Sequence, residues 1–88
     1  MIYRLETTPK FDKQLKKLDK TSQKQIVAFL LKNIDGTENP RIFGKRLIGN
    51  RKGFWRYRVG DYRIICDIQD EECLILALET GHRKDIYK

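Results

Sequence analysis

The side chains in this sequence best suited to chemistry are arginines that alternate with aromatic residues between positions 54 and 63. This segment reads Phe-Trp-Arg-Tyr-Arg-Val-Gly-Asp-Tyr-Arg, with arginines at positions 56, 58 and 63. A guanidinium group is a planar fork of N–H donors that matches phosphate oxygens, whereas lysine is more often a solubilising surface residue. Arginines at this spacing therefore indicate a phosphate-bearing ligand.

The charge of the chain is concentrated around the same segment. The 88 residues carry a net charge of +7. Residues 41–63 contain a single acidic residue, Asp61, and eight basic ones, so this quarter of the chain alone accounts for +7. The basic residues are Arg41, Lys45, Arg46, Arg51, Lys52, Arg56, Arg58 and Arg63. We interpret the lysines of residues 1–40 as solvated helix surface and the middle segment as a surface for an anionic partner.

The C-terminal segment, residues 79–88, holds a second group of side chains with chemical potential. It contains His82, the single histidine of the chain, followed by Arg83 and Tyr87. We expect these side chains to emerge near the arginines, at the edge of a sheet. Such groups can move protons to and from ribose hydroxyls, although a lone histidine is more often structural and Tyr87 can simply anchor the terminus.

Composition excludes several classes of protein. The longest apolar runs, Ile26–Leu31 and Cys73–Leu78, are far shorter than the roughly 20 residues that cross a bilayer, so no membrane contact is expected. Two cysteines make no disulfide framework, and no Cys/His cluster has zinc spacing, so we expect neither a metal nor another cofactor. Because the N-terminus also lacks a signal-peptide pattern, we expect a reduced, cytoplasmic protein.

A strand and two helices are predicted in the first half of the chain. Residues 2–7 alternate as a strand does, and Thr8-Pro9 is a helix start. Apolar residues then recur at helical spacing until residues 19–21 interrupt the pattern. A second helix, capped by Thr21 or Ser22, ends before Gly36. The short connection makes the two helices an antiparallel hairpin.

The second half of the chain is predicted to form three strands after a basic loop over residues 36–52. The strands are residues 54–59, 62–69 and 73–80, and the last is apolar on both faces, as a central strand is. We therefore predict a single α+β domain over residues 1–88. In it, the N-terminal strand joins a small, mostly antiparallel four-stranded sheet, and the helical hairpin packs on one face.

A two-residue turn at positions 60–61 fixes how two of these strands pair. Val59 then faces Tyr62 and Arg58 faces Arg63, and cross-strand partners share a face of the sheet. The face expected to carry the helices comprises Trp55, Tyr57, Val59, Tyr62, Ile64, Cys66 and Ile68. The other face comprises Phe54, Arg56, Arg58, Arg63, Ile65 and Asp67. Like charges opposite each other are destabilising, and a polyanionic ligand would offset that cost.

Ion pairs within the protein are the alternative explanation of the arginines. Arg58 or Arg63 could pair with Glu79 or Asp67. A three-residue loop at 70–72 would place Glu79 opposite Arg63. The same register would put Leu74, Leu76 and Leu78 on the core face, and Cys66 and Cys73 on opposite faces without a disulfide.

Residues 54–65 and the Gly-His-Arg-Lys-Asp-Ile-Tyr sequence of residues 81–87 together resemble the RelE branch of the RelE/ParE toxin superfamily. The order of elements agrees over essentially the whole chain. The resemblance implies a toxin that enters the A site of the 70S ribosome and cleaves the mRNA there, without a metal. It also implies a cognate, RelB-like antitoxin that binds the toxin and blocks it.

The resemblance also implies a set of site residues. Arg63 would stabilise charge on the phosphorane, and His82, Arg83 and Tyr87 would complete the catalytic group, with the general acid and base left open between His82 and Tyr87. The substrate-binding residues would be Arg56, Arg58, Lys52, Arg51, Lys45 and Arg46. Two other functions remain in view, a ParE-like inhibitor of DNA gyrase without catalytic activity and a sequence-tolerant RNA-binding module.

Overall fold

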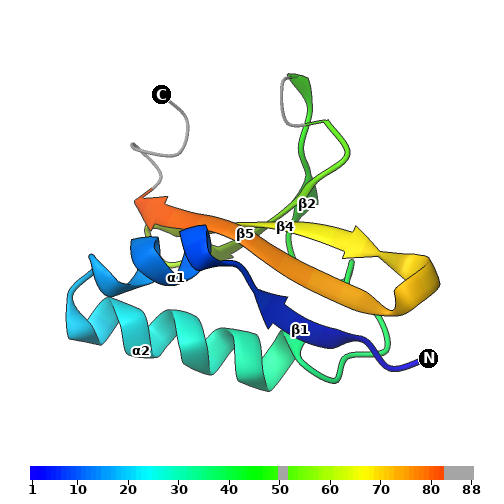
Figure 1. Cartoon of the computed structure of the whole chain (residues 1–88), viewed down its shortest axis with the longest axis horizontal. Coiled ribbons are helices and arrows are strands. Elements are labelled where there is room, and N and C mark those ends of the chain that lie inside the picture. Colours follow the sequence, from blue (N-terminus) through cyan, green and yellow to red (C-terminus); the bar gives the residue numbers. More distant parts are fainter. Residues whose placement is uncertain (50–51, 83–88) are drawn as a thin grey trace.

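The computed structural model describes residues 1–49 and 52–82. The elements are β1 (Arg4–Thr7), α1 (Pro9–Lys16), α2 (Lys20–Phe29), the π-helical turn η1 (Leu30–Ile34), β2 (Lys45–Arg46), β3 (Trp55–Val59), β4 (Tyr62–Gln69), the 3-10 turn η3 (Asp70–Glu72) and β5 (Leu74–His82). Figure 1 shows the two helices side by side on one side of the sheet, and the β2–β3 hairpin rising from the other. The predicted α+β class and helical hairpin are confirmed.

Within the described residues, the sheet has five strands in the order β1-β5-β4-β3-β2, and it is mixed. β1 pairs with β5 in parallel, and the other neighbours are antiparallel. The predicted four-stranded sheet therefore lacked β2, which forms inside the expected basic loop where Lys45 pairs with Arg56 and Arg46 with Trp55. A two-residue strand has no alternating pattern to detect. The internal place of β5 agrees with its apolar sequence.

Both helices begin at side-chain caps. The Thr8 side chain accepts a hydrogen bond from the Phe11 N–H, and Pro9 is the first helical residue, as expected. At α2, however, the cap is Asp19 rather than Thr21 or Ser22. One Asp19 carboxylate oxygen accepts from the Ser22 N–H and the other from the Ser22 hydroxyl, so the carboxylate starts the helix earlier than predicted. These bonds also hold the pKa of Asp19 below its ordinary value.

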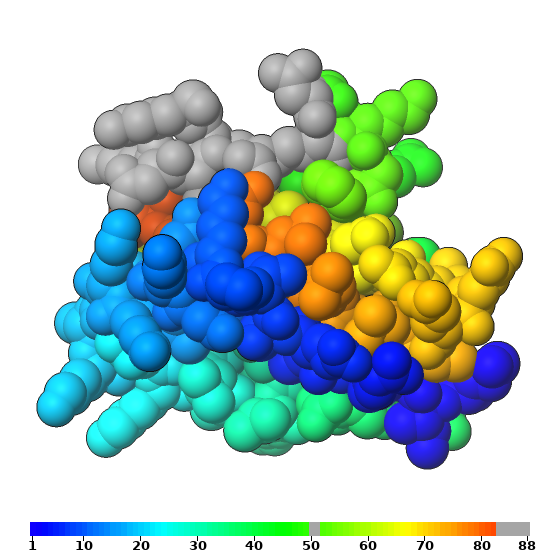
Figure 2. Space-filling view, in the orientation of Figure 1, coloured from blue at the N-terminus to red at the C-terminus, as the bar shows by residue number. Residues whose placement is uncertain are grey.

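The main core lies between the helices and the sheet. Its buried side chains are Phe11, Ile26, Leu30 and Ile34 from the helical layer and Tyr57, Ile64, Cys66, Ile75 and Ala77 from the strands. Trp55, Val59, Tyr62 and Ile68 pack against them, so the predicted helix-bearing face is confirmed. Figure 2 shows α1, α2 and β1 covering that side as a continuous surface. Among the described residues, no helix has the length and apolarity to cross a bilayer.

The pairing of β3 with β4 is the predicted one, but the pairing of β4 with β5 is not. Cys73 adopts a left-handed backbone with φ of 50°, so the turn holds one more residue than expected. A bulge between Ile65 and Cys66 then shifts the register again. As a result, Ile75 and Ala77 fill the core in place of Leu74, Leu76 and Leu78. Both cysteines are free, as expected, and burial raises the pKa of the Cys66 thiol.

Candidate functional site

Among the residues that the structure describes, three arginines lie on the sheet surface opposite the helices. Arg58 lies directly across from Arg63, and Arg56 lies across from Ile65. We call this surface, which also holds Lys45 and Glu79, the arginine face. A small apolar cluster of Leu47, Phe54 and Ile65 lies on the same side. The predicted convergence of the three arginines on the face without helices is confirmed by the register.

The arginines differ in burial. Arg63 is only 3% exposed, Arg56 is half-buried and Arg58 is exposed. The Arg63 guanidinium donates through Nη1 to the Tyr62 carbonyl at 3.4 Å, and the Thr80 hydroxyl donates to the Arg63 carbonyl at 2.9 Å. A buried cation is costly unless its surroundings satisfy it. The burial of Arg63 on the middle strand of the sheet therefore indicates a fixed charge rather than a solubilising one.

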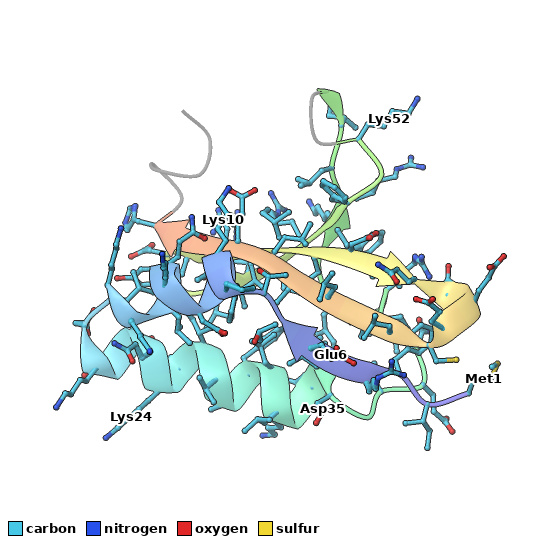
Figure 3. All side chains as sticks on the ribbon, viewed as in Figure 1. Met1, Glu6, Lys10, Lys24, Asp35 and Lys52 are labelled. Atoms are coloured by element: carbon cyan, nitrogen blue, oxygen red, sulfur yellow. The ribbon has the colours of Figure 1, made fainter. Side chains whose placement is uncertain are left out.

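The β2–β3 hairpin brings further cations to this side. Lys45 pairs with Arg56 and shares its face, whereas Arg46 pairs with Trp55 and is directed to the other face. Lys52 lies at the tip of the hairpin, away from the sheet (Figure 3). Of the four basic residues expected in this loop to bind substrate, Lys45 therefore lies on the arginine face, Lys52 projects above it, and Arg51 lies outside the described residues.

Gly44 and Trp55 hold β2 against β3. A Cβ atom at Gly44 would clash with the Arg56 carbonyl oxygen, and the backbone there has a positive φ of 79°, so both space and conformation require glycine. The Trp55 Nε1–H donates to the Phe43 carbonyl at 2.7 Å. The placement of Lys45 beside Arg56 therefore depends on a close approach of two backbones.

Arg41 belongs to the same basic segment but performs a structural task. Its Nη1 and Nη2 atoms donate to the two Asp70 carboxylate oxygens at 2.9 and 3.0 Å, and its guanidinium lies 5.8 Å from the centre of the Trp55 ring. The Tyr3 hydroxyl donates to the same carboxylate at 2.7 Å. The bonds from Arg41 and then from Tyr3 lower the pKa of Asp70. Composition alone gave no sign of this use of Arg41.

His82 lies on a different side from the one expected. It pairs across the strands with Tyr62, whose ring packs on the core. The rings of Tyr62 and His82 lie edge to face, with their centres 5.7 Å apart. A hollow of about 230 Å³ opens beside it, lined by Gln14, Lys17, Leu18, Thr80, Gly81 and His82. His82 thus faces the helices, while the arginines face away from them. Arg83 and Tyr87, the other expected catalytic residues of the tail, lie outside the described residues.

Glu79 occupies the place on the arginine face where the sequence suggested the tail would arrive. It lies opposite Ile65, and Gly81 lies opposite Arg63. Its carboxylate is 3.4 Å from the Lys10 ammonium group and its side chain is 18% exposed. Sequence reasoning treated Glu79 as an ion-pair partner of the arginines and not as a site residue.

Comparison with known proteins identifies one family over nearly the whole chain. A family model described as the ParE toxin of the type II toxin–antitoxin system parDE matches residues 5–87. A curated relative, the putative toxin RelE4 of Methanocaldococcus jannaschii, is 27% identical over 88 residues, which cover 99% of this chain and 93% of the relative.

Solved structures agree with this assignment. The RelBE2 toxin–antitoxin complex of Mycobacterium tuberculosis contains a chain that superposes with a TM-score of 0.84 at 26% identity, over 94% of this chain and all of the other. The archaeal RelE–RelB complex of Pyrococcus horikoshii gives a TM-score of 0.68 at 26% identity, over 94% of this chain and 97% of the other. The first of these structures is a toxin–antitoxin complex, and the second is a RelE–RelB complex.

Proposed function

The chain belongs to the ParE toxin family of type II toxin–antitoxin systems, and on that premise we propose that it is a ribosome-dependent endoribonuclease that cleaves mRNA in the A site of the 70S ribosome. The observation that carries this proposal is the convergence of Arg56, Arg58 and Arg63 on the sheet face without helices. Arg63 is nearly buried on that face, directly across from Arg58. The arrangement suits phosphodiester chemistry.

The proposed reaction is attack of a ribose 2′-hydroxyl on the adjacent phosphorus, which leaves a 2′,3′-cyclic phosphate and a 5′-hydroxyl. Arg63, fixed and nearly buried, would stabilise the charge that develops on the phosphorane, because a preorganised donor needs no reorganisation during the reaction. Arg56, Arg58 and Lys45 would hold the flanking phosphates. Arg83 and Tyr87 would join them from the tail, Tyr87 by stacking on a base or by proton transfer.

The antitoxin partner follows from the family, and its chemistry can be proposed further. We expect a RelB-like protein with an acidic or amphipathic segment that covers the arginine face or displaces the tail, since a basic surface selects an acidic partner. The toxin would act in the cytoplasm, where ribosomes translate. Co-purification of the product of a neighbouring gene tests this expectation.

The activity is tested by growth arrest and by mapping of message ends. Expression of the wild type should stop growth and create new 5′ ends within codons, which primer extension detects. Arg63→Ala should remove the arrest and lower the cleavage rate by a factor of about 100 or more, as loss of one preorganised donor does. Arg58→Ala, at an exposed position, gives the same test without disturbing a buried site.

Arg4→Ala is the matched control, because Arg4 is an exposed arginine of β1 that pairs with Glu6 at 2.8 Å. It should leave the arrest intact. Full toxicity of Arg63→Ala and Arg58→Ala would refute the assignment of the arginine face, and translated messages that stay intact on induction would refute the ribonuclease activity itself.

Inhibition of DNA gyrase is the second candidate, favoured by the family model that matches, which is named for ParE. A supercoiling assay with purified gyrase separates the two functions. Strong inhibition at stoichiometric protein, together with intact messages, would favour gyrase binding over RNA cleavage.

A further inference from the structure

In the described part of the chain, the arginine face holds several groups that stabilise negative charge and very few that can take a proton. An arginine has no lone pair to offer and stays protonated in proteins. His82 faces the helices because it pairs with Tyr62. Among the described residues on this face, Glu79 and Asp67 are the carboxylates that can accept a proton at neutral pH.

Strand register places Glu79 nearer to the reacting centre than Asp67. Arg63 lies opposite Gly81, and Glu79 is two residues away from Gly81 on β5. Glu79 and Arg63 are therefore diagonal neighbours on one face. The Cα atoms of such neighbours are about 7–8 Å apart, a distance that long side chains span. Asp67 is four residues from Arg63 along β4, about 13 Å at the rise of a strand. It also accepts a hydrogen bond from Gln69 at 3.0 Å.

Gly81 lies between these two side chains in the register. Because glycine has no side chain, no side chain of β5 lies directly opposite Arg63, and Arg58 lies opposite Arg63 on the side of β3. A phosphate bound by Arg63 would then have Arg58 on one side and the strand that carries Glu79 on the other.

Lys10 holds the Glu79 carboxylate at this position. Lys10 lies near the start of α1, beside the end of β5 (Figure 3), and its ammonium group is 3.4 Å from Glu79 Oε1. The Lys10 side chain remains well exposed while the Glu79 side chain is 18% exposed. This ion pair joins the Glu79 carboxylate on β5 to α1.

We propose that Glu79 is the general base that accepts the proton of the attacking ribose 2′-hydroxyl; this inference rests on the proposed ribonuclease function. The proton passes from the 2′-hydroxyl to the Glu79 carboxylate as the 2′-oxygen forms its bond to phosphorus. The bond from phosphorus to the 5′-oxygen breaks, and the 5′-oxygen takes a proton from water. Glu79 then returns its proton to water.

The test is the pH dependence of cleavage by Glu79→Gln on 70S ribosomes carrying an mRNA in the A site. With toxin in excess, single-turnover cleavage should fall by a factor of about 100 or more at pH 7, without a change in the toxin concentration that half-saturates the ribosome. Without a base, hydroxide must remove the proton, so the rate of the variant should rise about tenfold per pH unit from pH 6 to 9. The wild-type rate should rise less steeply, because carboxylates are already ionised there.

Two further variants separate a base from a structural ion pair. Glu79→Asp keeps the carboxylate and should keep the wild-type pH dependence at a reduced rate. Glu72→Gln makes the same chemical change in the exposed η3 turn and should cleave as the wild type does. Equal melting temperatures of the wild type and Glu79→Gln would show that the fold is retained.

Three outcomes are informative. If Glu79→Gln cleaves at the wild-type rate, or more slowly but with the wild-type pH dependence, Glu79 is not the base and the proposed activity stands. If the wild type itself cleaves no mRNA on ribosomes, the proposed activity fails and this inference fails with it. A steeper pH dependence confined to Glu79→Gln supports the assignment.

Discussion

At the scale of single residues, the same guanidinium group occurs in three different surroundings, at Arg41, Arg58 and Arg63. Arg41 binds Asp70 through two nitrogens and lies over Trp55. Arg63 is nearly buried, and Arg58 opposite it is exposed. The Arg41 guanidinium is held by Asp70 and has a structural role. The exposed Arg58 side chain is accessible to a ligand. The charge of the arginine face is therefore divided between a buried arginine and an exposed one.

Gly44→Ala should destabilise the protein more than a glycine replacement at an equally unusual backbone position. Both Gly44 and Gly49 have positive φ angles, 79° and 74°, which costs an alanine about 1–2 kcal/mol. At Gly49 no atom lies near the added Cβ, whereas at Gly44 it meets the Arg56 carbonyl. We expect Gly44→Ala to lose more than 2 kcal/mol of unfolding free energy in urea titration, because the clash adds to the backbone cost.

Gly49→Ala is the control for this prediction, because it measures the cost of a positive φ angle without a clash at the added Cβ atom. If the two variants unfold at the same urea concentration, the close approach of Gly44 to β3 contributes nothing to stability. Gly44→Ala should also weaken the proposed activity, because it separates Lys45 from Arg56.

At the scale of elements, α1 completes the edge of β5 where β1 ends. β1 pairs with β5 only as far as Thr7 and Ala77. The Thr8 hydroxyl then donates to the Ala77 carbonyl at 3.0 Å, and the Gln14 side-chain oxygen accepts from the Thr80 N–H at 2.9 Å. These side chains satisfy backbone groups that a longer strand would have paired. The end of β5, which carries Glu79, is thereby held in extended form.

The contact of Asp70 with Arg41 and Tyr3 joins three elements and should make stability depend on acid. The pKa of Asp70 is lower in the folded protein than in the unfolded chain. Its contribution is therefore complete above the unfolded pKa, near 3.9, and is lost as pH falls through the folded pKa. We expect Asp70→Asn to lower the melting temperature at pH 7. The loss of unfolding free energy is at most about 1 kcal/mol, because both partners are exposed. The difference in melting temperature between Asp70→Asn and the wild type should shrink between pH 5 and 2.

Glu71→Gln serves as the comparison, since it neutralises a neighbouring carboxylate of the same turn. Its melting temperature should stay close to that of the wild type across the same pH range. A constant gap between Asp70→Asn and the wild type down to pH 2 would contradict the role given to the ionised carboxylate.

The sequence predicted one strand pairing and not the next, for a physical reason. The two-residue turn at residues 60–61 leaves a single register for β3 and β4, which the structure confirms. Before β5, the left-handed Cys73 and the bulge at Ile65 have no signature in residue type. Because one residue of slip reverses the face of each side chain, the turn put Ile75 and Ala77 in the core, and the second slip at the bulge left Glu79 on the predicted face. The fold and the face of the arginines were therefore predictable, and the pairing of β4 with β5 was not.

At the scale of the whole molecule, the main core and the arginine face lie on opposite sides of the sheet. The helices cover one face of the sheet, and the arginines and the β2–β3 hairpin occupy the other (Figure 1). The principal extents are 34, 29 and 22 Å, which leaves little depth for an enclosing cleft. An open basic face of this size suits a substrate that another body holds in place, as the ribosome would hold mRNA.

This separation predicts that RNA affinity depends on salt through the arginine face alone. Each phosphate contact to a single strand contributes about 0.7 to the slope of log affinity against log salt concentration. Contacts from Arg56, Arg58, Arg63 and Lys45 would give a slope of about −3 for a 2′-O-methyl oligonucleotide, which cannot react. Fluorescence anisotropy between 50 and 300 mM salt measures it. Arg58→Ala should reduce the slope by about 0.7, since it removes one phosphate contact.

Lys13 and Lys24 provide the matched control, because they are exposed lysines of α1 and α2, the elements on the other side of the sheet. Replacing both with glutamine lowers the net charge by two, which is more than Arg58→Ala does. If charge alone governs binding, the double variant must show the larger change in slope. If the arginine face makes the contacts, its slope stays at the wild-type value while that of Arg58→Ala falls, and the position of the charge rather than its amount determines recognition.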